Sequence, residues 1–176
     1  GVATNGQLPI GDGTTAPVLA TLTQGTGVTI TNGAGTITIA ASATSTVADR
    51  VHRTAGDVTV TGTTLTDLTG ASITLTTGAN PALVGFTGTC QQTGANNAIV
   101  YNVDVDGTDE LGTDGIVFRA DVVDQETNCS FVMMTSDLTA ASHTFKLQWR
   151  TSATGTATTN CAGADPCNFW VKEVTD

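Results

Sequence analysis

Along most of the chain, apolar and polar residues alternate with the period of two that is typical of β-strands. In the clearest run, His143, Phe145, Leu147 and Trp149 alternate with more polar residues. Shorter alternating runs occupy residues 58–61 and 73–76, and further strand candidates are 82–86, 98–105, 115–123, 130–134 and 168–174. No helical period extends over more than two turns. We therefore predict an all-β protein whose part after residue 48 is an antiparallel jelly-roll sandwich of roughly eight strands.

Residues 28–41, VTITNGAGTITIAA, have the pattern of a β-hairpin. Apolar residues alternate with Thr, and Asn32-Gly33 predicts the turn. A lone hairpin is marginal in water because nothing covers its apolar face. We therefore expect the same segment of other chains to cover it, with three copies closing a slender apolar core around an axis. The predicted core residues are Val28, Ile30, Ile37 and Ile39.

Composition agrees with strands and turns, since the chain has 37 Thr, 20 Gly and only 4 Pro. Charge divides it in two: residues 1–48 contain one charged side chain, Asp12, and every other charged residue follows. The small, polar stretch 40–49 has the composition of a linker. We therefore predict two parts, 1–48 and 49–176, of which the first would be an extended hairpin stalk and the second the jelly-roll head.

The formal net charge of the whole chain is −10, with 6 Lys and Arg against 16 Asp and Glu. Six basic side chains can neutralise only a few phosphate groups. We therefore expect no nucleic-acid partner and no anionic membrane partner. No apolar run reaches the ~18 residues of a transmembrane helix. No leader of the charged-then-apolar kind is visible either.

The even number of cysteines in an acidic, Thr-rich chain favours disulfides and an extracellular setting. Cys161 and Cys167 enclose a turn-like segment, so we expect them to pair, and Cys90 could pair with Cys129. Four buried free thiols are the alternative. A structural zinc site is disfavoured because the chain has no CxxC pair and only two His.

The acidic run 104–115, DVDGTDELGTDG, could hold a hard cation. Asp104, Asp106 and Asp109 are its candidate Ca²⁺ ligands. The run departs from an EF-hand loop, because Asp109 replaces the glycine of the sixth position and Gly115 the glutamate of the twelfth. We therefore expect no cofactor, with an irregular Ca²⁺ site as the weaker hypothesis and a solvated loop as its alternative.

No pattern indicates an enzyme. The sequence has no GxSxG motif and no recognisable triad, and no catalytic residue is predicted. His143 shares a strand face with Phe145 and Trp149, so we interpret it as a packed or interface histidine. Trp170 is out of phase with Phe169 and Val171, so one of the two tryptophans is expected to face outward or a subunit interface.

Residues 5–42, NGQLPIGDGTTAPVLATLTQGTGVTITNGAGTITIAAS, resemble a module of bacteriophage fibre and spike proteins, in which it forms an intertwined trimeric stalk or attachment segment. Residues 64–90, 142–152 (SHTFKLQWRTS) and 168–174 (NFWVKEV) are similar to the small jelly-roll heads of such proteins, which share their plan with the C1q and tumour-necrosis-factor family. The segment CAGADPC at 161–167 departs from that pattern.

This resemblance implies a non-enzymatic structural protein of a bacteriophage virion, a homotrimeric spike, fibre or capsid decoration. Its partners would be its own copies and other virion proteins of the capsid, neck or tail. Two alternatives remain open: a receptor-binding tip for a host glycan or surface protein, and an extracellular bacterial adhesin or filament subunit.

Overall fold

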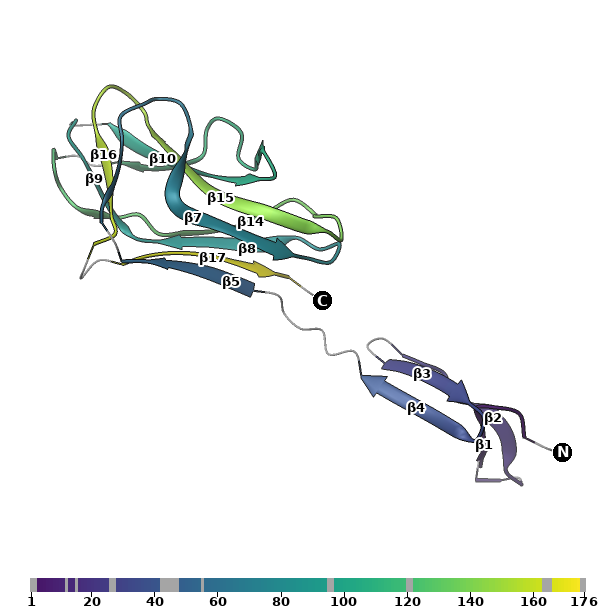
Figure 1. Cartoon of the computed structure of the whole chain (residues 1–176). Coiled ribbons are helices and arrows are strands. Elements are labelled where there is room, and N and C mark those ends of the chain that lie inside the picture. The colour runs from purple at the N-terminus through teal and green to yellow at the C-terminus, as the bar shows by residue number, and fades with distance from the viewer. Residues whose placement is uncertain are drawn as a thin grey trace. The chain divides into compact units, whose positions relative to one another are not determined.

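The computed structural model describes residues 3–11, 13–14, 16–25, 28–41, 48–54, 56–94, 97–119, 122–162 and 166–174. The chain divides into two compact units, Gly1–Ser45 and Thr46–Asp176 (Figure 1). In the described ranges every regular element is a β-strand, and all of the strand pairs are antiparallel. The all-β prediction is therefore confirmed.

The first unit contains two hairpins. Strand β1 (Gln7–Ile10) pairs with β2 (Val18–Thr21), and β3 (Val28–Gly33) pairs with β4 (Thr36–Ala41). The register sets Gly33 opposite Thr36, so the turn is Ala34-Gly35, with Gly35 at a φ of 71°. The predicted Asn32-Gly33 turn is wrong. That turn would leave Ile39 beyond the end of β3, whereas the observed one places it opposite Ile30.

Apolar side chains of the first unit stay exposed in the single chain. Among its described residues only Gly6 is buried. Val28, Ile30, Ile37 and Ile39 lie on one face of the β3–β4 hairpin, as the alternation predicts, and Ile39 is 61% exposed. Val18 on β2 is 62% exposed. Val28, Ile30 and Ile37 are half-buried, so the four predicted core residues form an apolar row that the single chain covers only in part.

The second unit is a sandwich of two sheets. In the β10 sheet, β10 lies between β15 on one side and both β11 and β12 on the other, and β7 is next to β15. The bounds of these strands are β7 (Thr66–Thr76), β10 (Ala98–Val105), β11 (Thr108–Asp109), β12 (Ile116–Arg119) and β15 (Ser142–Thr151).

The other layer, which we call the β8 sheet, consists of two four-stranded sheets, β14-β8-β17-β5 and β13-β9-β16-β6. Their strand orders correspond, so we describe them together as four long strands, each interrupted once: β5–β6, β8–β9, β13–β14 and β16–β17. Their bounds are β5 (Ala48–Arg53), β6 (Val58–Val60), β8 (Ala82–Thr87), β9 (Thr89–Gln92), β13 (Thr127–Asn128), β14 (Phe131–Met134), β16 (Ala157–Asn160) and β17 (Cys167–Glu173). If each interrupted pair counts as one strand, and β11 and β12, which both pair with the same side of β10, also count as one, the eight strands have the order 1-8-3-6 in the β8 sheet and 2-7-4-5 in the β10 sheet. This is the jelly-roll order.

Aromatic side chains fill the space between the two sheets. Tyr101 of β10 is fully buried and stacks on Trp149 of β15, with ring centroids 6.1 Å apart. Phe86 of β8 lies 5.3 Å from the same tyrosine ring. The Tyr101 hydroxyl is 2.7 Å from the Thr159 hydroxyl, so its polar end is satisfied, and burial raises the pKa of Tyr101. Trp149 is therefore the inward-facing tryptophan of the two.

Candidate functional site

The four long strands of the β8 sheet are interrupted at one level, and both disulfides lie there. The breaks follow Arg53, Thr87, Asn128 and Asn160. Cys161 bonds Cys167 across the last break, and Cys90 of β9 bonds Cys129 beside β13. These are the pairs expected from the sequence. All four cysteines are buried, so they are structural and offer no thiol nucleophile.

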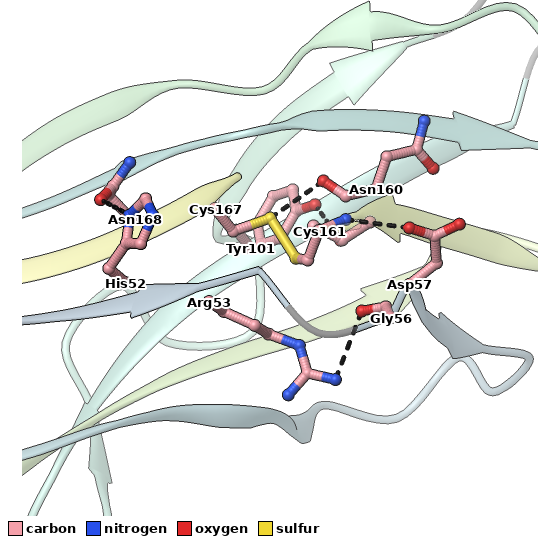
Figure 2. The surroundings of a disulfide bond; sticks show 10 residues. His52, Arg53, Gly56, Asp57, Tyr101, Asn160, Cys161, Cys167 and Asn168 are labelled. Atoms are coloured by element: carbon pink, nitrogen blue, oxygen red, sulfur yellow. Dashed lines mark hydrogen bonds between the residues drawn. A yellow bond between two sulfur atoms is a disulfide. The ribbon is translucent and has the colours of Figure 1, made fainter. Parts of the chain in front are cut away.

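Figure 2 shows the surroundings of Cys161–Cys167. The amide of Cys161 donates a 3.0 Å hydrogen bond to Asp57 Oδ1, and Arg53 Nη2 donates to the carbonyl of Gly56 at 3.3 Å. On the outer side, His52 Nδ1 donates to Asn168 Oδ1 at 2.7 Å. The Asp57–Cys161 contact joins the interruption of β5–β6 to that of β16–β17, so the disulfide lies at a seam between these neighbouring strands.

The three candidate Ca²⁺ ligands do not form a metal-binding cluster. Asp104 and Asp109 are register partners on β10 and β11, but Asp106 lies in the turn between them at a φ of 54°. Both Asp106 oxygens accept hydrogen bonds, from His143 and from the amide of Thr144. Within the described ranges, no group of three or more His, Cys, Asp or Glu could hold a metal ion.

His143 lies between two acceptors that favour its cationic form. Its Nδ1 lies 2.7 Å from Asp106 Oδ2 and its Nε2 lies 2.9 Å from the carbonyl oxygen of Thr139, so both ring nitrogens donate. The Thr139 carbonyl, and then Asp106, raise the pKa of His143 above 6.5. The amide of Thr144, and then His143, lower the pKa of Asp106 below 3.8. With both nitrogens occupied, this ring is a packed structural cation rather than a free general base.

Stability should depend on pH through this pair. The raised pKa of His143 stabilises the fold fully below about pH 6.5, and this contribution is lost as pH rises through the folded-state value. The lowered pKa of Asp106 stabilises the fold above about pH 4, and this contribution is lost as pH falls through its folded-state value. Urea denaturation between pH 3 and pH 9 should show that His143→Gln lowers the free energy of unfolding by about 1 kcal/mol near pH 5.5. This difference should become smaller by pH 9. A penalty independent of pH would contradict the charged assignment.

Asn102, which sequence reasoning missed, organises the acidic segment. It is fully buried in the middle of β10. Its Nδ2 donates to the Gly112 carbonyl at 2.6 Å, and its Oδ1 accepts from the amides of Val103 and Leu111. Asn102 thus anchors the segment between β11 and β12 to β10, while residues 111–114 of that segment stay exposed, in line with the solvated-loop interpretation. An asparagine inside the run AIVYNVDV was the available signal.

A polar groove lies on the outer side of the β10 sheet. It has a volume of about 630 Å³, and its lining includes Asp104, Asp109, Gln148, Arg150 and Thr113. Asp104 is 5% exposed, and the buried Oε1 of Gln148 has no hydrogen-bond partner within the described part of the chain. The groove thus combines carboxylate and amide acceptors with a guanidinium donor, a mixture that can bind hydroxyl groups.

The outer side of the β8 sheet, in contrast, has an apolar surface. Trp170 of β17 lies here, half-buried, and Val132 and Met134 of β14 are 60% and 57% exposed. The prediction that one tryptophan faces outward is therefore correct for Trp170. A hollow of about 390 Å³ adjoins this ring at the edge strand β5, next to Arg50 and Lys172.

Strand order and surface together define an all-β protein with one jelly-roll unit and one hairpin unit. No family model matches the sequence, and no curated protein matches it. The described residues contain no helix that is long and apolar enough to cross a membrane.

Two kinds of solved structure are similar to the chain. PRD1 vertex protein P5 has 15% sequence identity and a TM-score of 0.39, over 89% of this chain and 87% of that one. The D431N mutant VP2 protein of infectious bursal disease virus has 12% identity and a TM-score of 0.44, over 94% of this chain and 44% of that one. TM-scores this low do not establish a shared fold, so the jelly-roll assignment rests on the strand order.

Proposed function

We propose that this protein is a non-enzymatic structural component of a bacteriophage virion, a homotrimeric spike, fibre or decoration protein. The first unit would be the stalk that trimerises and attaches to another virion protein, and the second unit the head. One observation carries the proposal: the first unit has no buried apolar side chain among its described residues, yet Val28, Ile30, Ile37 and Ile39 share one face. Such a unit needs a partner to fold.

Three copies around an axis satisfy this need most economically. Each hairpin would bury its apolar row against the other two and leave the Thr rows in water. The sequence resemblance of residues 5–42 to phage stalk modules supports the same arrangement. The disulfides suit a particle that works outside the cell, where thiols oxidise.

The direct test uses purified virions. Antibodies against the second unit should label particles at fixed positions in electron micrographs, and particles that lack the protein should be fragile or incomplete while still adsorbing to cells. Labelling confined to secreted filaments of uninfected bacteria would contradict the proposal and favour the adhesin alternative.

The groove on the β10 sheet favours a second candidate, a receptor-binding tip for a host glycan. Two carboxylates would repel an anionic ligand, whereas neutral sugar hydroxyls can both donate to Asp104 and accept from Arg150. If this candidate is correct, the purified full chain should compete with virions for adsorption, and Arg150→Ala should weaken that competition about tenfold. Unaltered adsorption at saturating protein would exclude it.

A further inference from the structure

The outer side of the β8 sheet has the residue pattern of a surface that is covered in the assembled protein. We define the Trp170 face as Leu83, Gly85, Val132, Met134 and Trp170. In the strand register, Trp170 is opposite Gly85, which is opposite Val132 on the next strand. The neighbouring row sets Lys172 opposite Leu83, which is opposite Met134. Three adjacent strands thus present a continuous apolar surface.

Because Gly85 has no side chain, the indole of Trp170 can lie flat on this face. A Cβ at Gly85 would collide with Cε2 and Cζ2 of Trp170, so the indole lies directly against the glycine backbone. The ring therefore covers the position where β8 lacks a side chain, and it adds a broad aromatic surface between Leu83 and Val132. Large rigid aromatic rings in such a setting are typical anchors of protein interfaces.

The sequences of β8 and β14 agree with burial on both sides. β8 reads ALVGFT and β14 reads FVMM, with apolar residues at consecutive positions. A strand with one face in water normally alternates, whereas a strand covered on both faces reads as a continuous apolar run. The core covers Val84 and Phe86 on the inner side. Within the described residues of the chain, the outer side has no comparable cover.

Charge indicates what covers it. Arg50 is opposite Trp170 on β5, and Lys172 follows Trp170 by two residues on β17. Neither side chain is in an ion pair within the described residues. The chain as a whole has a net charge of −10 with only six Lys and Arg. A second copy of this chain is therefore an acidic partner that matches two unpaired cations beside an apolar surface.

We infer that the Trp170 face is the contact between heads in the assembled protein, and that it packs on a different, acidic surface of a neighbouring copy. If the same face of two copies met, Arg50 and Lys172 of one copy would lie against Arg50 and Lys172 of the other, and like charges would repel. Such self-complementary contacts also make dimers rather than trimers. A contact between two different surfaces can close a ring of three. This inference rests on the proposed homotrimer and names the surface that the head contributes.

The two tryptophans provide the test. Trp149 is 1% exposed and should be shielded from acrylamide, so quenching of fluorescence reports on Trp170. When the full chain has the mass of a trimer, we expect acrylamide to quench its fluorescence no more than it quenches the Trp170→Phe variant, in which only Trp149 emits. Val132→Asp should raise quenching several-fold, and Val132→Lys should raise it less, because the partner surface is acidic. Val132 is 60% exposed in the single chain, so neither change should unfold it.

Four results would contradict the inference, and the measured mass shows which of them also contradict the proposed trimer. A trimer with freely quenched Trp170 would refute the Trp170 face and leave the proposed function standing. A monomer with freely quenched Trp170 would refute both. A monomer with shielded Trp170 would mean that the chain covers this face itself, which excludes the second copy. Equal effects of Val132→Asp and Val132→Lys would refute the acidic partner surface.

Discussion

Replacement of Ile30 and Ile39 by aspartate should convert the assembled protein into monomers with a folded head. The two isoleucines are register partners on the apolar face of the β3–β4 hairpin, where Ile30 is half-buried and Ile39 is exposed. In a trimer the double variant would place six carboxylates in one slender apolar core. Each unpaired buried charge costs several kcal/mol, so the loss of assembly should exceed a thousandfold in affinity. Sedimentation velocity would measure the mass, and circular dichroism would report the head.

Thr31 and Thr38 provide the matched control for this experiment. They are also register partners, one position along from Ile30 and Ile39, and they lie on the opposite face of the same hairpin. Thr31→Asp with Thr38→Asp therefore adds the same charges to the same strands on the side that should face water. We expect this variant to keep the mass of the unaltered protein. Equal behaviour of the two double variants would show that the apolar row is not the assembly core.

Loss of the Cys90–Cys129 disulfide should destabilise the head by about 4 kcal/mol, because the bond joins residues 39 apart and so constrains a long loop of the unfolded chain. For a unit of this size the melting temperature should fall by about 15 °C. The double variant Cys90→Ala with Cys129→Ala, followed by thermal unfolding in oxidising buffer, measures this effect.

The second disulfide provides the comparison. Cys161–Cys167 joins residues only 6 apart, so the same chain-entropy argument gives about 2 kcal/mol for Cys161→Ala with Cys167→Ala. All four side chains are buried, so the lost sulfur volume is the same in both variants. A larger loss for the short loop than for the long one would contradict the entropic account and indicate that the local seam with Asp57 dominates.

Much of the fold could be predicted from short apolar runs and from alternation. The run around 143–150 alternates and became β15, because side chains on successive strand positions point to opposite faces, whereas the largely apolar runs around 82–86 and 98–105 became β8 and β10. Turn chemistry was less decisive. Both Asn32-Gly33 and Ala34-Gly35 can form a two-residue turn, and cross-strand pairing of Ile30 with Ile39 selects the second.

The surface could be predicted only in part. The phase of Trp170 indicated an outward ring, but its fit against Gly85 depends on the pairing of β17 with β8, which lie more than 80 residues apart. The acidic run suggested either a metal site or a loop in water. The anchoring of this segment by Asn102 depends on backbone groups ten residues away, whose positions no local pattern encodes.

The solution mass of the full chain, measured by light scattering in oxidising buffer, tests the central claim most directly. The account predicts three chains per particle, about three times the 17.8 kDa of one chain. The same mass should persist in reductant, because both disulfides lie within one chain. A monodisperse monomer at every concentration would contradict the trimeric stalk, and another protein would then have to cover Val28, Ile30, Ile37 and Ile39.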